Sequence, residues 1–148
     1  MTRKTARAIA VRLCFALSES GTGADELIDT VFNEEYYKSL AEEDAAFSEY
    51  PDGAQKEYIL KLLRGIGEHS AELDSYIEKY ARGWKFSRIS RTALALMKTA
   101  MYEVLYMPDI PNGAAINEAV ELAKDYEEPD TVRFINGILG SFVRGEIQ

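Results

Sequence analysis

The chain has 148 residues, enough for a domain with a substantial core, and 47% of them are hydrophobic. Its net charge is -8, and its single cysteine, Cys14, excludes an intrachain disulfide and a cysteine-based metal cluster. No apolar run approaches the roughly 20 residues of a membrane span, and no signal-peptide pattern is evident. These features predict a cytoplasmic protein that does not enter a membrane.

Charge is distributed unevenly along the chain. Residues 1–12 contain no acid and the cations Arg3, Lys4, Arg7 and Arg12. Residues 19–49, in contrast, are strongly acidic and contain one cation, Lys38. Because salt screens charges beyond about 10 Å, the basic segment could bind phosphates despite the distant acids. A solvated, frayed terminus is the alternative of equal weight.

The hydrophobic periodicity is helical throughout. It predicts an all-α fold, a compact bundle of about seven helices in two helical halves. The expected helices cover residues 5–19, 25–40, 54–68, 70–81, 90–107, 113–126 and 130–144. Ser70 is a candidate N-cap, and the helix at 90–107 is apolar on most sides, which is typical of a central, buried helix. Either the acidic segment 41–53 or the connector 82–87 could divide the halves.

The sequence contains no pattern that indicates an enzyme. Its only histidine, His69, cannot form a triad or a multi-histidine metal site, and a capping or dipole role near a helix end is the favoured interpretation. No glycine-rich phosphate loop is present. Cys14 lies among apolar residues and is expected to be inert packing. We therefore expect no catalytic residue, metal or cofactor.

The last predicted helix carries an aromatic residue away from its core stripe. On a helical wheel Ile135, Ile138, Leu139 and Phe142 form that stripe, whereas Phe134 lies with Gly137 on another face, beside Arg133. Such a ring next to a cation suits stacking on an unpaired base. The alternative, which the wheel alone favours, is that Phe134 packs beneath a neighbouring helix or loop.

The first predicted helix also has a second apolar face. Val11 and Phe15 are spaced i, i+4 on the side away from the core stripe, and Glu19 continues that row. A helix that is apolar on two faces is either enclosed in the bundle or docks a partner protein. If the last helix packs near the start of the first, then Arg3, Arg7 and Phe134 would share one surface.

Three longer stretches share a resemblance. They read ARAIAVRLCFAL near the N-terminus, ISRTALALMKTAMYEVLY in the centre and IPNGAAINEAVELAKDYEEPDTVRFINGIL near the C-terminus. Together they resemble the NusB family of bacterial transcription antitermination factors over nearly the whole chain. The resemblance implies one NusB-like RNA-binding domain over residues 1–148, made of two helical halves, without catalytic activity or cofactor.

The resemblance also implies a function and its residues. NusB-like proteins bind boxA-type single-stranded RNA in nascent transcripts, such as ribosomal RNA leaders. They do so with the ribosomal protein NusE, and help assemble an antitermination complex on RNA polymerase. By motif match the RNA-binding residues are Arg3, Lys4, Arg7, Asp130, Arg133 and Phe134. The partner-binding residues are Val11, Phe15 and Glu19.

Several alternatives stay open. The same fold could act as a protein-interaction module without RNA, or as a stand-alone accessory domain related to RNA methyltransferases. Without its partner, the protein could pair as a homodimer through Val11 and Phe15. Asn117 and Asn136 are expected to satisfy backbone groups of a neighbouring loop, and Gly137 is expected to permit close approach of a helix or of RNA.

Overall fold

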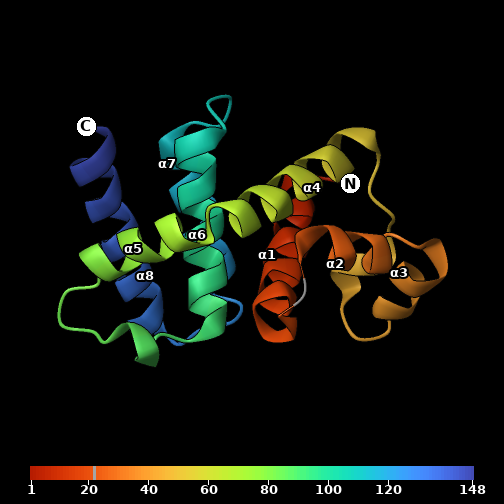
Figure 1. The fold of residues 1–148 in the computed structure, drawn as a ribbon, viewed down its shortest axis with the longest axis horizontal. Coiled ribbons are helices and arrows are strands. Elements are labelled where there is room, and N and C mark those ends of the chain that lie inside the picture. Colours follow the sequence, from red (N-terminus) through yellow and green to blue (C-terminus); the bar gives the residue numbers. More distant parts are fainter. Residues whose placement is uncertain (22) are drawn as a thin grey trace. The chain divides into compact units, whose positions relative to one another are not determined.

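The computed structural model describes residues 1–21 and 23–148, except for the side chains of Glu19 and Ser20. These residues form helices and turns and include no strand, which confirms the predicted all-α fold. The chain divides into two compact units, Met1–Gly67 and Glu68–Gln148, as the expectation of two helical halves requires (Figure 1). The division lies at the end of a helix, so the prediction of a boundary at 41–53 or 82–87 is wrong.

The first unit is built from four α-helices and one 3₁₀ turn. They are α1 (Arg3–Ser20), α2 (Ala24–Val31), α3 (Glu34–Leu40), η1 (Ala45–Ser48) and α4 (Gly53–Glu68). The acidic segment 41–53 belongs to this unit because Phe47 within it is buried and packs against Tyr37, with the ring centroids 5.2 Å apart. The acidic side chains therefore lie around an apolar anchor, and the segment is not a linker.

The predicted helix over 25–40 is two helices. Asn33 interrupts it with extended backbone, and its side-chain oxygen accepts hydrogen bonds from the backbone N–H groups of Glu35 and Tyr36. Asparagine is a favoured N-cap, and the acids of the following turn complement the helix dipole. The local signal for a new helix was present in the sequence but lies within continuous apolar periodicity.

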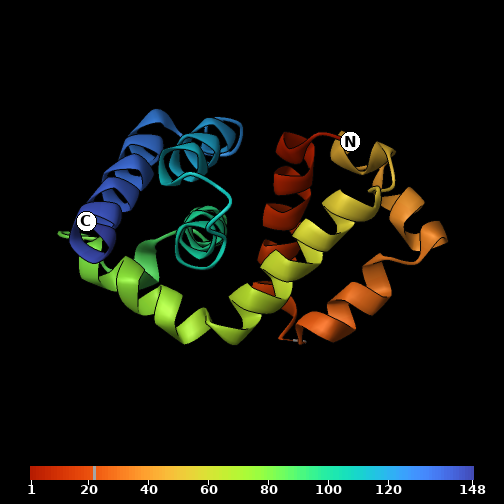
Figure 2. The same ribbon diagram turned by 90° about the horizontal axis from the view of Figure 1, so that it is seen from above.

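The second unit surrounds a central helix. It contains α5 (Ser70–Tyr80), the 3₁₀ turn η2 (Phe86–Arg88), α6 (Arg91–Tyr106), α7 (Asn112–Ala123), α8 (Pro129–Phe142) and the π turn η3 (Val143–Ile147). Figure 2 looks nearly along α6, which contacts α5, α7 and α8. Leu96, Met97 and Met101 of α6 are fully buried, which confirms the predicted central helix.

The start of α5 differs from expectation. His69 is the N-cap residue, and Ser70 is the first residue of the helix, so the predicted capping role of Ser70 is wrong. The Ser70 hydroxyl instead accepts a hydrogen bond from Lys98 Nζ at 3.2 Å. The His69 ring stacks on Tyr106, with centroids 4.3 Å apart. Packing between α5 and α6 thus decides the roles of both side chains.

Candidate nucleic-acid interface

The cations of α1 stand where they oppose the helix dipole. Thr2 caps the helix by accepting a hydrogen bond from the Thr5 backbone N–H at 3.1 Å, and the first turn contains no acid. Cations near a helix N-terminus are unfavourable by about 0.3–1 kcal/mol each. The unbalanced charge of Arg3 and Lys4, both exposed, therefore costs local stability and is available to an anionic ligand.

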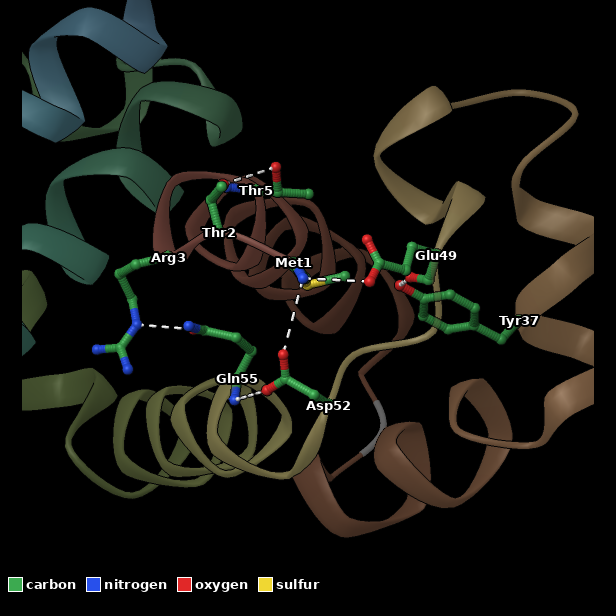
Figure 3. Close-up of polar contacts among 8 residues, drawn as sticks. All are labelled: Met1, Thr2, Arg3, Thr5, Tyr37, Glu49, Asp52 and Gln55. Carbon is green, nitrogen blue, oxygen red and sulfur yellow. Dashed lines mark hydrogen bonds and ion pairs between the residues drawn. The ribbon is translucent and has the colours of Figure 1, made fainter.

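The start of the chain is held by polar contacts that leave Arg3 oriented. The Met1 amine lies 3.1 Å from a Glu49 carboxylate oxygen, a hydrogen bond that raises the pKa of the amine above its ordinary value. Arg3 Nε donates to Gln55 Oε1 at 2.8 Å (Figure 3). The Arg3 guanidinium also lies 4.1 Å from the centroid of the Tyr58 ring. Arg3 is thus both exposed and ordered by its neighbours.

The three predicted cations of α1 are not equivalent. Arg3 and Lys4 are exposed, but Arg7 is only 5% exposed, with its guanidinium carbon 5.7 Å from the Tyr58 centroid. Arg3 and Arg7 thus approach the same aromatic ring, and of the two only Arg3 is exposed. A phosphate would meet Arg3 and Lys4 first, and the expectation that Arg7 is an open surface cation is wrong.

On α8 the predicted polar residues form one exposed pair. Asp130, in the first turn, accepts a hydrogen bond from Arg133 one turn later, and both side chains are exposed. Such solvent-exposed i, i+3 pairs contribute at most about 1 kcal/mol. A phosphate could therefore displace Asp130 from the guanidinium at little cost, or the pair could bind together as a donor and acceptor.

Phe134 has a neighbour that the sequence motifs do not indicate. Its ring packs on Trp84, with the centroids 4.2 Å apart and the planes at 42°. Phe134 is half-buried, whereas Trp84 is 50% exposed. Both rings line a small cavity of about 90 Å³, together with Arg88, Ile89, Ser90, Ala93, Glu127 and Thr131. Phe134 is therefore neither a core residue nor a freely exposed platform; the two rings form one aromatic pair.

A charge signal in the sequence could have identified the region around Trp84. Residues 79–102 contain no aspartate or glutamate, in a chain whose net charge is -8. The cations of this stretch are Lys79, Arg82, Lys85, Arg88, Arg91 and Lys98. The family motifs place the expected RNA-binding residues near the two ends of the chain and assign none to this basic stretch.

The face of α8 next to Phe134 is open. A Cβ atom added at Gly137 would meet nothing within 4 Å, so no helix of the described residues approaches there. Asn136 and Asn117 are exposed, and their side chains make no hydrogen bond within the part of the chain that the structure describes. The expectation that the two amides satisfy a neighbouring loop is wrong.

The predicted partner-binding residues lie on α1 in different environments. Val11 is 3% exposed, so it is not an open apolar position as expected. Phe15 is half-buried. The Glu19 side chain lies outside the described residues. Among the described side chains of this set, Phe15 is therefore the one that is exposed in part and could contact a partner.

The first unit also contains an apolar groove on another side of α1. Its volume is about 310 Å³, and its lining is Arg12, Leu13, Ala16, Leu27, Val31, Tyr36, Leu40, Glu43, Asp44 and Phe47. Arg12 Nε donates to Asp44 Oδ2 at 2.7 Å across its rim. Apolar walls with acids at the edge are suited to an apolar side chain on a basic segment of a partner protein.

The described residues support neither a membrane-spanning helix nor a metal site. None of their helices combines the length and apolarity that crossing a bilayer requires. Their histidine, cysteine, aspartate and glutamate side chains form no group of three that could hold a metal ion. Arg3, Lys4 and Arg7 lie in the first unit, and Asp130, Arg133 and Phe134 in the second. That they act as one surface stays a prediction.

Comparison with known proteins agrees with the fold and with the sequence motifs. The profile of the NusB family matches residues 4–144. A transcription antitermination protein NusB from Acetivibrio thermocellus is 40% identical over 144 residues, which cover 97% of this chain and 90% of the relative. Of solved structures, T. maritima NusB has a TM-score of 0.79 at 25% identity, covering 98% of this chain and 92% of that one.

A further similarity concerns the fold alone. A chain from the crystal structure of the antitermination factors NusB and NusE in complex with double-stranded RNA has a TM-score of 0.75 at 23% identity, and the match covers 96% of each chain. The family profile and the curated relative each span nearly the full length of this chain. The chain described here therefore belongs to the NusB family, a family of transcription antitermination factors and not of enzymes.

Proposed function

We propose that this protein is a transcription antitermination factor that binds boxA-type single-stranded RNA in nascent transcripts, such as ribosomal RNA leaders. In this role it acts with the ribosomal protein NusE and helps to assemble an antitermination complex on RNA polymerase in the cytoplasm. It acts by binding, and it catalyses no reaction of its own. The whole chain, residues 1–148, serves as one RNA-binding domain.

The observation that carries the proposal is that the family-matched helices carry a partly exposed aromatic ring and exposed cations. Phe134 lies one residue from Arg133 on α8, and Arg3 and Lys4 are exposed at the start of α1. Aromatic rings stack on unpaired bases, and cations neutralise the phosphates between them. These two elements together suit a single strand better than a duplex, whose bases are already stacked.

The partner surface in this proposal is acidic and apolar. Val11, Phe15 and Glu19 are the assigned contacts on α1, and the acidic segment 19–49 attracts a basic protein. Charge complementarity of this kind raises the association rate and favours the correct partner. When NusE is absent, the half-buried Phe15 could bring two copies together, which sedimentation of the protein with and without NusE would detect.

The experiment that tests the function is an RNA titration with and without NusE. The protein should bind a boxA-type single strand with an affinity that falls as salt rises, and NusE should strengthen binding. The same RNA annealed to its complement serves as control and should bind more weakly. Absence of salt-dependent RNA binding, both with and without NusE, would refute the proposal.

The groove of the first unit favours one alternative, a protein-interaction module without RNA binding. Its lining includes the acids Glu43 and Asp44 beside apolar walls, which suit a basic partner. This alternative predicts partner binding that survives replacement of Arg3 and Arg7 by alanine together, with no RNA binding by any form of the protein. The titration above therefore separates the two functions.

A further inference from the structure

The connector between α5 and α6 carries positive charge that the protein itself does not neutralise. Arg82, Lys85 and Arg88 are exposed, and none of them forms an ion pair within the described residues. Other cations of this unit are paired: Lys79 lies 2.6 Å from a Glu146 oxygen, and Lys98 lies 2.7 Å from an Asp74 oxygen. The connector cations are therefore available to an external anion.

The surroundings of the connector strengthen this charge. No acid occurs between residues 79 and 102, so Arg82, Lys85 and Arg88 are not opposed by their own segment. One acid borders the cavity beside them: Glu127 Oε1 accepts a hydrogen bond from the Ser90 hydroxyl at 2.7 Å. Arg82, Lys85 and Arg88 thus outnumber this single carboxylate, which is already hydrogen-bonded to Ser90. The result is a local positive patch on a protein whose net charge is -8.

Trp84 stands among these cations with much of its surface in water. Its exposure of 50% is high for so large an apolar side chain. Gly83 precedes it with φ of 81°, a left-handed conformation that other residues rarely adopt, and this turn directs the chain into Trp84. The indole packs on Phe134 on one side, with centroids 4.2 Å apart. Because one part of the indole is held by Phe134 and another part is exposed, the ring can stack on an unpaired base.

We propose that residues 81–88, the connector 82–87 with one flanking residue on each side, form an additional contact site for single-stranded RNA. Trp84 stacks on a base and extends the surface begun by Phe134, while Arg82, Lys85 and Arg88 neutralise neighbouring phosphates. This inference rests on the proposed function, because it assigns further residues to the same RNA-binding activity. An acidic protein partner is the less favoured occupant, since it would use the cations but leaves the exposed indole without a role.

The chain has a single tryptophan, so its fluorescence reports on Trp84 alone. We expect titration with a boxA-type single-stranded RNA to quench this emission at the same RNA concentrations at which binding is measured by anisotropy of labelled RNA. Trp84→Ala should weaken RNA binding about 5- to 150-fold, the range for one stacked base. Trp84→Phe should restore most of the affinity because it retains an aromatic face.

Two control variants separate specific contacts from general effects. Tyr36→Ala removes another exposed aromatic, 45% exposed, from the acidic first unit. Because Tyr36 lines the groove offered to a protein partner, this control is titrated with RNA alone, where the affinity should be unchanged. A triple variant, R82Q/K85Q/R88Q, should weaken RNA binding and reduce the slope of log K against log salt by about 2, because each lost phosphate contact contributes about 0.7. Its counterpart K38Q/K61Q/R64Q has the same net charge and should retain the slope.

The outcomes distinguish this inference from the function on which it rests. If the wild-type protein fails to bind RNA, the proposed function is refuted. If the wild type binds RNA but Trp84→Ala and the connector triple variant behave as their controls, only the connector site is refuted. Loss of binding to an acidic protein with RNA binding intact would assign the connector to that partner instead. Thermal denaturation of each variant establishes that it is folded at the assay temperature.

Discussion

Replacing Phe134 tests the structural interpretation of the last helix most directly. Truncating a fully buried phenylalanine to alanine costs about 3–5 kcal/mol of folding free energy. Phe134 is half-buried and packs on the partly exposed Trp84, so we expect roughly half of that cost, about 2 kcal/mol, for Phe134→Ala. The loss of a stacked base should in addition weaken RNA binding by about 1–3 kcal/mol.

Phe134→Leu separates the two losses, because leucine retains apolar volume but lacks an aromatic face. It should cost less than about 1.5 kcal/mol in stability, yet weaken RNA binding nearly as much as alanine does. Ile138→Val, on the buried face of the same helix, is the matched control: it should cost about 0.5–1.5 kcal/mol in stability and leave RNA binding unchanged.

The assays are denaturant unfolding followed by circular dichroism and RNA titration at fixed salt, below the unfolding transition of every variant. Wild-type RNA affinity in both Phe134 variants would refute the base-stacking role. If Phe134→Ala destabilises the protein by more than about 3 kcal/mol while RNA binding persists, the ring is a core residue. The alternative that Phe134 packs beneath a neighbouring helix or loop would then hold.

Three further predictions follow from named contacts. Gly137→Ala should stabilise α8 by about 0.5–1 kcal/mol, because the added methyl group meets open space. It should weaken RNA binding if RNA approaches that backbone closely; an unchanged affinity would exclude such an approach. Arg3→Gln should lower the salt slope of RNA binding by about 0.7, and an unchanged slope would show that Arg3 contacts no phosphate. Burial raises the pKa of Tyr37 to about 12 from 10.0, so stability should be fully present below pH 10 and fall as pH approaches 12. Tyr37→Phe should lessen this alkaline loss in denaturant midpoints measured across that range, and an identical pH profile would contradict the reasoning.

Much of the fold could be predicted because helix signals are local. Ser90 caps α6 by accepting a hydrogen bond from the Ala93 backbone N–H, and Pro108 follows soon after the helix ends at Tyr106. The apolar spacing of α8 likewise placed Ile135, Ile138 and Phe142 in the core, where they are 0–3% exposed. These features depend on neighbours within one or two turns, so the sequence contains them explicitly.

Some local signals were outweighed by others. Asn33 is an N-cap inside a stretch of continuous apolar periodicity, and periodicity predicted a single helix where the cap separates two. Ser70 has the chemistry of a cap, but its hydroxyl bonds Lys98, whose position depends on the packing of α6 against α5. Whether a polar side chain at a helix end caps that helix depends on which hydrogen-bond partner lies within reach. That partner can be distant in sequence, as Lys98 is from Ser70.

The sequence by itself determined the family, the helical fold and the direction in which Phe134 leaves its helix, because motifs and a 100° repeat are properties of the chain. The tertiary structure decided how much of that ring meets solvent. Trp84, from a loop distant in sequence, covers one part of Phe134, and packing leaves Arg7 buried while Arg3 remains exposed. Periodicity specifies which way a side chain points, but exposure depends on what the rest of the chain places in front of it.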